Sequence, residues 1–195
     1  MATDDPASAP AWHWMPWSPG RPVDPVARAW LAPRLGCAAG DIVLGRDARG
    51  RPWLGPGHDA DTSWSHSGDG LLLAFARGAR VGIDLEQERP RPRALALAQR
   101  FFGAEEAAWV QGQADAAART IAFLRLWCAK EAVLKAHGRG LAFGLDRLAF
   151  AERDGALALV AADHALGAVD AWQVREFVPH AGLRLHLAPE LAQLR

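Results

Sequence analysis

The sequence predicts an α+β protein made of two lobes of similar size. Helical patterns followed by hairpin-like strands occur twice along the chain, and a proline-rich connector separates the two sets. Half of the 195 residues are hydrophobic and 23% are charged, which is typical of a globular protein with a sizeable core. We expect an N-terminal extension over residues 1–25, one lobe over residues 26–88 and a second over residues 89–195.

The first lobe opens with a helix, expected over Val26–Leu35. Asp24 is placed to cap its N-terminus, Pro25 takes the first helical position, and Gly36 follows its end. Before it, the first ten residues are expected to be disordered. The tryptophans that follow them fit a short edge strand or a cap on the body of the protein; they are Trp12, Trp14 and Trp17.

The strands of the first lobe are expected at Ile42–Leu44, Leu71–Ala76 and Val81–Glu86. The polar segment Thr62–Asp69 places His66 at a turn or strand edge. Arg77–Arg80 has the length and glycine content of a hairpin loop, so residues 81–86 are expected to return beside residues 71–76. Asp84 and Glu86 are two residues apart, and a strand therefore directs both carboxylates to one face.

The second lobe follows the connector Glu88–Arg93, which holds Pro90 and Pro92. Its helices are expected at Ala94–Phe102, Ala104–Val110 and Ala116–His137, the last stopped by Gly138. Its strands are expected at Leu148–Glu152, Ala156–Ala161, Trp172–Val178 and Leu183–Leu187. Asp154-Gly155 is a strong hairpin signal between the first two strands.

The long helix carries the most informative stretch, WCAKEAVLK over residues 127–135. Trp127, Glu131 and Lys135 follow one another at four-residue steps and share a face. Lys130 and Lys135 are the only lysines, against 20 arginines, which indicates a place where a compact ammonium is preferred. Lys130 lies one step off that face, so we expect it to meet a structural carboxylate or solvent.

Three carboxylates are available from two rigid elements: Asp84 and Glu86 from a strand and Glu131 from the helix. Clustered carboxylates repel one another unless a cation or protons neutralise them. Oxygen ligands without neighbouring cysteine favour Mg²⁺, with Mn²⁺ as the alternative, and this is the arrangement of phosphoryl-transfer sites. Each pattern alone also fits a solvated face or a surface Glu–Lys pair.

Composition excludes several classes of function. The formal net charge is zero, which argues against a dedicated nucleic-acid binder. Cys37 and Cys128 have no metal-binding spacing and suit a reducing compartment. No apolar run is long enough to span a membrane, and residues 1–10 lack a signal pattern. We therefore expect a cytoplasmic protein with no membrane or nucleic-acid partner.

Taken in order, the segments RGRPWL, SWSHSG, GIDLE, FF and WCAKEAVLK resemble the 4'-phosphopantetheinyl transferase superfamily, in its larger, monomeric, Sfp-type class. The resemblance covers roughly residues 26–187 and is most specific at residues 82–86 and 127–135. It implies a monomer of two similar lobes related by a pseudo-twofold axis. Each lobe would be a small antiparallel sheet packed with a long helix.

The resemblance also implies a reaction. Asp84, Glu86 and Glu131 would bind Mg²⁺ together with the pyrophosphate of coenzyme A. The serine hydroxyl of an acyl or peptidyl carrier protein would attack the β-phosphate, with Glu131 as its base directly or through water. Lys135 would stabilise the transferring phosphate or protonate the leaving group. The products would be the loaded carrier and adenosine 3',5'-bisphosphate.

Coenzyme A contacts follow from the same resemblance. Ser65 and His66 would contact its phosphates, and Arg51 with Pro52 would lie along the adenosine and the 3'-phosphate. The lysines that similar proteins place near the N-terminus against the 3'-phosphate are missing here. The arginines that remain as substitutes are Arg21, Arg28 and Arg46.

The carrier protein is expected to dock on the region Ala94–Val110, which follows the metal-binding strand. Phe101 and Phe102 would offer apolar contact there, although closing the lobe interface is an equal alternative for at least one of them. Complementary charge would come from Arg91, Arg93 and Arg100. Two other functions stay open: a catalytically silent relative that only binds coenzyme A or a carrier, and an unrelated metal-dependent phosphohydrolase.

Overall fold

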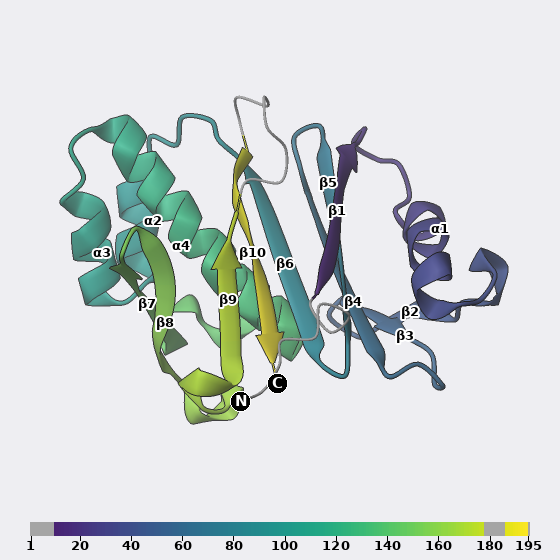
Figure 1. The fold of residues 1–195 in the computed structure, drawn as a ribbon. Helices are drawn as coiled ribbons and strands as arrows, with labels where there is room; N and C mark the ends of the chain where they lie inside the picture. Colours follow the sequence, from purple (N-terminus) through teal and green to yellow (C-terminus); the bar gives the residue numbers. More distant parts are fainter. Residues whose placement is uncertain (1–9, 178–185, 195) are drawn as a thin grey trace.

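The computed structural model describes residues 10–177 in full and the backbone of residues 186–194, and Figure 1 shows its mixed α+β fold. Two three-stranded antiparallel sheets lie at the centre, in the orders β1-β5-β4 and β6-β10-β9. The other strands form two two-stranded ribbons, β2-β3 and β7-β8. The predicted α+β class is confirmed, and the division into lobes at residues 88/89 stays a prediction.

The helices are α1 (Asp24–Leu35), α2 (Ala94–Phe101), α3 (Ala104–Gln111) and α4 (Ala116–His137). The strands are β1 (Ala11–Pro16), β2 (Leu44–Arg46), β3 (Pro52–Leu54), β4 (Ala60–Ser67), β5 (Gly70–Arg77), β6 (Arg80–Gln87), β7 (Leu148–Arg153), β8 (Ala156–Ala162), β9 (Trp172–Glu176) and β10 (His186–Leu194). The disorder expected at residues 1–9 and most of the strand expected at Leu183–Leu187 lie outside the described residues.

The helix termini show where local signals decide structure. Helix α4 has the predicted bounds, with Asp115 as its N-cap accepting a hydrogen bond from Ala118 N at 2.8 Å. Helix α1 ends at Gly36, which adopts the left-handed conformation at φ 72°. Its N-cap, however, is Val23, so Asp24 is the first helical residue and its carboxylate faces the positive end of the helix dipole instead.

Strand pairing decides one prediction and corrects another. The polar segment that was expected to place His66 at a turn or strand edge contains β4, an edge strand that forms a hairpin with β5 around Gly68 and Asp69. Strand β6 does not return beside β5; it pairs with β10, more than 100 residues later in the sequence. The loop at residues 77–80 had suggested a hairpin, but the local sequence contains no information about a partner so distant. The edge-strand interpretation of the tryptophan cluster is confirmed, since β1 carries Trp12 and Trp14 at the edge of its sheet.

A seam of polar side chains joins β4 to β6. Alternate residues of β4 accept hydrogen bonds from main-chain N–H groups of β6: Asp61 Oδ2 from Val81 (2.8 Å), Ser63 Oγ from Ile83 (3.3 Å) and Ser67 Oγ from Gln87 (2.9 Å). These side chains satisfy donors that a neighbouring strand would otherwise pair. The seam therefore fixes β6 relative to the first sheet without direct pairing of the two strands.

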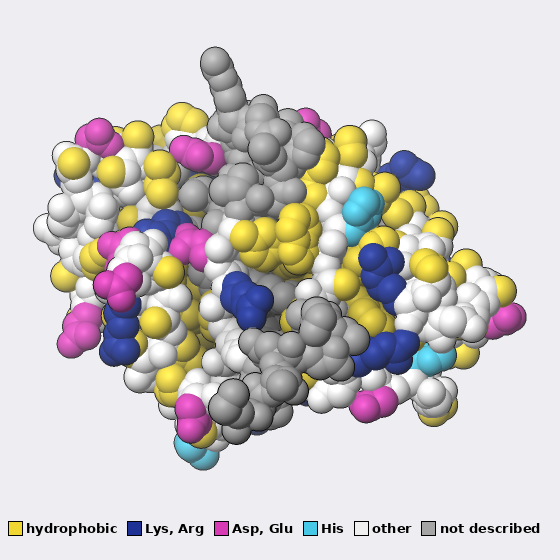
Figure 2. All heavy atoms as spheres, in the orientation of Figure 1, with side chains coloured by type: hydrophobic (Ala, Val, Ile, Leu, Met, Phe, Trp, Pro, Cys, Tyr) yellow, Lys and Arg dark blue, Asp and Glu magenta, His cyan; other side chains and the backbone are white. Residues whose placement is uncertain are grey.

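The two halves also meet at the surface. Ring centroids of Trp12 on β1 and Phe177 after β9 lie 4.6 Å apart. On the face of the molecule seen in Figure 2, hydrophobic side chains gather near the middle, with Lys and Arg side chains beside them. Aromatic packing thus adds to the polar seam at the junction.

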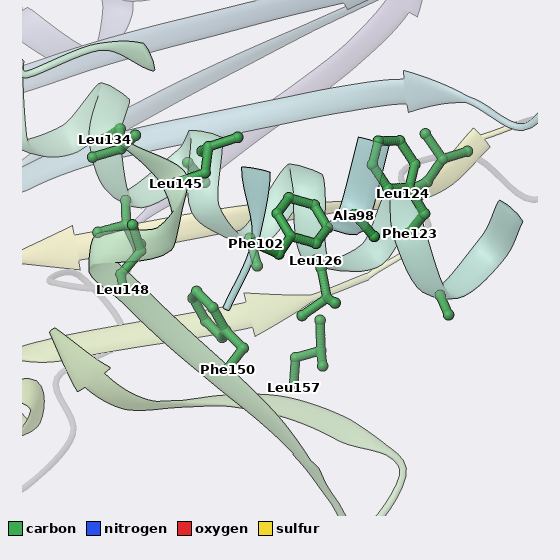
Figure 3. Packing of buried hydrophobic residues seen from close by; sticks show 14 of the residues in the cluster. Ala98, Phe102, Phe123, Leu124, Leu126, Leu134, Leu145, Leu148, Phe150 and Leu157 are labelled. Carbon is green, nitrogen blue, oxygen red and sulfur yellow. The ribbon is translucent and has the colours of Figure 1, made fainter. Parts of the chain in front are cut away.

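The core of the C-terminal half lies between α2, α3, α4 and the β7-β8 ribbon. Figure 3 shows Phe102 and Leu126 beside Phe150 and Leu157, and Phe123 stacks on Phe102 with ring centroids 5.4 Å apart. The β7-β8 turn is formed by Asp154 and Gly155, both at positive φ, as the hairpin signal predicted. Among the described residues, no helix combines the length and apolar character needed to cross a membrane.

Candidate functional site

Helix α4 packs directly against β6 at Gly82. A Cβ atom at this position would collide with Ala132 O and Ala136 N, which are main-chain atoms of the helix. Only glycine therefore permits this approach of helix and strand. This close contact brings the strand segment that carries Asp84 next to the helix turn that carries Glu131 and Lys135.

The three predicted carboxylates share one electrostatic environment. Asp84 and Glu131 are buried, with 5% and 9% of their surface exposed, and Glu86 is half-buried. Burial, reinforced by the Asp84 carboxylate, raises the pKa of Glu131 to about 7. Burial and Asp84 also raise the pKa of Glu86, against the opposing effect of Arg91. The acids destabilise one another's charge, so the site is suited to accept a cation.

Lys135 supplies positive charge to this centre. Its Nζ lies 2.6 Å from Asp84 Oδ1 and donates to Ser65 Oγ and Ile83 O, each at 3.1 Å. Burial opposes the charged form, but attraction to Asp84 outweighs it and raises the pKa of Lys135. Ser65 Oγ donates in turn to Asp84 Oδ1 at 2.8 Å. Lys135 and Ser65 thus link β4, β6 and α4.

The donor set fits a hard divalent cation. Among the described residues, no group of three or more His, Cys, Asp or Glu side chains is already arranged to hold a metal ion. However, Asp84 Oδ2 is buried and has no hydrogen-bond partner among the described residues. An unpaired buried carboxylate oxygen beside two further acids of raised pKa is the chemistry that Mg²⁺ binding would satisfy.

A cavity of about 360 Å³ opens beside the acidic centre. All five residues that the resemblance assigns to coenzyme A line it: Arg51, Pro52, Ser65, His66 and Lys135. Two further arginines line it. Arg46 is one of the candidate substitutes for the missing lysines, and Arg49 belongs to the RGRPWL segment but had no predicted role. Its lining within the described residues contains no carboxylate, so the cavity is cationic.

Other predicted residues take different places. Lys130 is fully buried and pairs with Glu106 Oε2 at 2.8 Å, which confirms the expected structural carboxylate. Arg91, expected at the carrier surface, binds Glu86 Oε2 at 2.7 Å. Phe102 is buried in the core, whereas Phe101 is 37% exposed. Phe102 therefore has the packing role considered for it, and docking of a carrier stays a prediction for Phe101.

Comparison with known proteins relates the chain to one family. The model of the 4'-phosphopantetheinyl transferase superfamily matches residues 80–185. A putative 4'-phosphopantetheinyl transferase of Synechocystis sp. is 33% identical over 124 residues, which cover 62% of this chain and 50% of the relative. The 4'-phosphopantetheinyl transferase HetI of Nostoc sp. is 34% identical over 120 residues, 60% of this chain and 50% of the relative.

A vertebrate relative matches a similar share of the chain. The L-aminoadipate-semialdehyde dehydrogenase-phosphopantetheinyl transferase of Xenopus laevis is 30% identical over 133 residues, 63% of this chain and 44% of the relative. This chain spans about half the length of the curated relatives it matches, or somewhat less. The family model covers more than half of the chain and includes both β6 and α4. The chain belongs to the 4'-phosphopantetheinyl transferase superfamily.

Proposed function

We propose that the chain transfers the 4'-phosphopantetheine arm of coenzyme A to a serine of an acyl or peptidyl carrier protein, in a Mg²⁺-dependent reaction that releases adenosine 3',5'-bisphosphate. One observation carries the proposal: a cationic cavity adjoins a buried acidic centre, and Lys135 contributes to both. Arginine and lysine suit the phosphates of coenzyme A, and the carboxylates suit the cation that accompanies them. The names of the relatives support the same transferred group.

Each acidic residue has a role in this proposal. Asp84, Glu86 and Glu131 would hold Mg²⁺, which when bound neutralises charge on the pyrophosphate and orients it. The Glu131 carboxylate takes the proton of the carrier serine, directly or through water, as the hydroxyl attacks the β-phosphate. Lys135 Nζ stabilises the charge that develops on the transferring phosphate. Ser65 and His66, which line the cavity, would contact the phosphates of coenzyme A, and Arg51 with Pro52, in the same lining, would lie along the adenosine.

We further propose a cytoplasmic monomer of the Sfp-type class as the working form. The support for the monomer is that both three-stranded sheets belong to one chain. Light scattering of the purified protein measures this directly, and a stable dimer or trimer would contradict it.

The reaction itself is tested by the intact mass of an apo carrier protein after incubation with this protein, coenzyme A and Mg²⁺, with EDTA as a control. We expect a metal-dependent gain of one phosphopantetheine arm. Asp84→Asn and Glu131→Gln should each reduce the rate by about 10²- to 10³-fold, because charge stabilisation at the transferring phosphate is lost. Asp170→Asn, at an exposed aspartate, is the matched control and should react at the wild-type rate.

The outcomes separate the competing functions. Coenzyme A binding without any gain on several carriers would indicate the catalytically silent relative. Release of phosphate from simple esters without a carrier would indicate a phosphohydrolase. Near-normal turnover of either carboxylate variant would remove the proposed metal site.

Carrier docking on α2 and α3 makes a separate prediction at Phe101. Its ring is exposed on α2 with the Arg100 guanidinium 5.1 Å from the ring centroid, so it offers apolar and positive contact together. Phe101→Ala should raise the KM for the carrier by about tenfold and leave the KM for coenzyme A unchanged. Val160→Ala, equally exposed but on β8, is the control. Equal effects of the two substitutions would place the carrier elsewhere.

A further inference from the structure

Arg51 lies in the wall of the cavity, but its guanidinium is committed to the protein itself. The side chain is only 9% exposed. Nε donates to Lys135 O at 2.6 Å, Nη1 to Pro52 O at 3.0 Å, and Nη2 to Val81 O at 3.3 Å and to the Asp61 carboxylate. Every nitrogen of the guanidinium is thus used, and the partners come from β3, β4, β6 and α4.

The hydrogen bond from Arg51 Nε to Lys135 O lies at the C-terminal end of α4. The helix ends at His137, and carbonyls of its last turn have no intrahelical donor. Leu134 O is satisfied by the N–H groups of Gly138 and Arg139. Lys135 O is satisfied by Arg51, a cation at the negative end of the helix dipole. Arg51 is therefore a helix cap supplied from the residue before β3, far from α4 in the sequence.

Lys135 is consequently held at two points. Arg51 fixes its main-chain carbonyl, and Asp84, Ser65 and the Ile83 carbonyl bind its ammonium. A lysine side chain has many rotamers, so its reactive nitrogen is placed only if the backbone that carries it is fixed. The cap supplies that constraint at the residue itself.

Asp61 completes the arrangement. It pairs with the Arg51 guanidinium, and its Oδ2 also accepts from Val81 N at 2.8 Å, at one end of the polar seam. Arg49, which also lines the cavity, differs: it is exposed, and its guanidinium makes one long contact with the described residues, from Nη1 to Gly138 O at 3.5 Å. The guanidinium of Arg49 is free to approach a ligand in a way that Arg51 is not.

We infer that Arg51 and Asp61 are a positioning pair for Lys135, and that Arg51 does not bind a phosphate of coenzyme A. The inference rests on the proposed function for its link to turnover. It replaces the contact of Arg51 with the 3'-phosphate that the family resemblance implies. Asp61, for which no role was predicted, acts on Lys135 by orienting Arg51.

Two variants distinguish positioning from phosphate binding, because the two roles predict opposite effects for Asp61. As a positioning pair, Arg51→Gln and Asp61→Asn should each lower kcat by about 10- to 100-fold and leave the KM for coenzyme A unchanged. Calorimetry should give the same ratio of affinities for coenzyme A and 3'-dephospho-coenzyme A as in the wild type. If Arg51 binds the 3'-phosphate, Arg51→Gln should abolish that ratio, and Asp61→Asn should tighten coenzyme A binding.

A readout without turnover separates failure of this inference from failure of the proposed function. Hydrogen exchange of the peptide spanning residues 134–140 should accelerate in Arg51→Gln and Asp61→Asn, because the end of α4 loses its cap. Arg46→Gln is the control and should exchange at the wild-type rate, because the Arg46 guanidinium binds Asp24 and Gly50 O, which lie outside this peptide. If the wild-type protein loads no carrier, the proposed function is overturned. The exchange experiment still tests the cap in that case. Unchanged exchange in both cap variants, measured well below their melting temperatures, would overturn the inference.

Discussion

Replacing Gly82 by alanine is expected to lower the free energy of unfolding by about 3 kcal/mol and the transfer rate by about 100-fold. The new methyl group would enter the contact between β6 and α4, where its neighbours are Ala132 O and Ala136 N. Both are main-chain atoms, so no side-chain rotation relieves the collision, and the helix must move away from the strand. That movement separates Glu131 and Lys135 from Asp84, which is why stability and activity should fall together.

Gly40→Ala is the matched control for this substitution. Gly40 is not at a strained positive φ, and an added Cβ there has no atom of the described residues within 4 Å outside its chain neighbours. We expect a change of no more than about 0.5 kcal/mol in urea unfolding and full activity in the mass assay. A Gly82→Ala variant as stable as Gly40→Ala would show that the close approach of helix and strand does not hold the site together.

Replacing Lys130 by methionine is expected to cost about 3–5 kcal/mol, because it breaks a buried ion pair from one side. Lys130 is fully buried, and its Nζ lies 2.8 Å from Glu106 Oε2 and 2.7 Å from Leu145 O and also donates to Leu148 O. Removal of the ammonium leaves the buried Glu106 carboxylate without its counter-charge. The loss should appear in urea unfolding as a lower midpoint.

Two further variants test the origin of that loss. Arg153→Met removes an exposed cation and should change stability by no more than about 0.5 kcal/mol. Glu106→Gln should also destabilise, since Glu106 accepts hydrogen bonds from Gly103 N and Phe150 N as well. The double variant Lys130→Met/Glu106→Gln should lose less stability than the sum of the losses of the two single variants. Full additivity would mean that the two side chains do not act as a pair.

The features that follow from local sequence were predicted closely. Helix α4 has its expected bounds because Asp115 and Gly138 act within one turn of its ends. The turn at Asp154-Gly155 follows from residues that tolerate positive φ. The period of four along α4 likewise placed Glu131 and Lys135 on one face, and the structure brings that face to Asp84.

Partners distant in sequence were not predictable in the same way. The polar serines of β4 left a turn and a strand edge as alternatives, and Ser63, Ser65 and Ser67 alternate as a strand requires. That period of two was the available signal, and its meaning depends on β6 lying alongside. The pairing of β6 with β10 and the cap that Arg51 places on α4 depend on tertiary contacts alone.

The sequence by itself determined the α+β class, the bounds of the long helix, and the carboxylates and lysine that meet at the site. These depend on propensities, caps and side-chain period, which act over a few residues. Only the tertiary structure decided which strands pair, which arginine is buried and which is free, and that Gly82 sets the distance between strand and helix. Those outcomes depend on how segments far apart in the chain exclude water and satisfy one another's hydrogen bonds, and no short stretch of sequence contains that information.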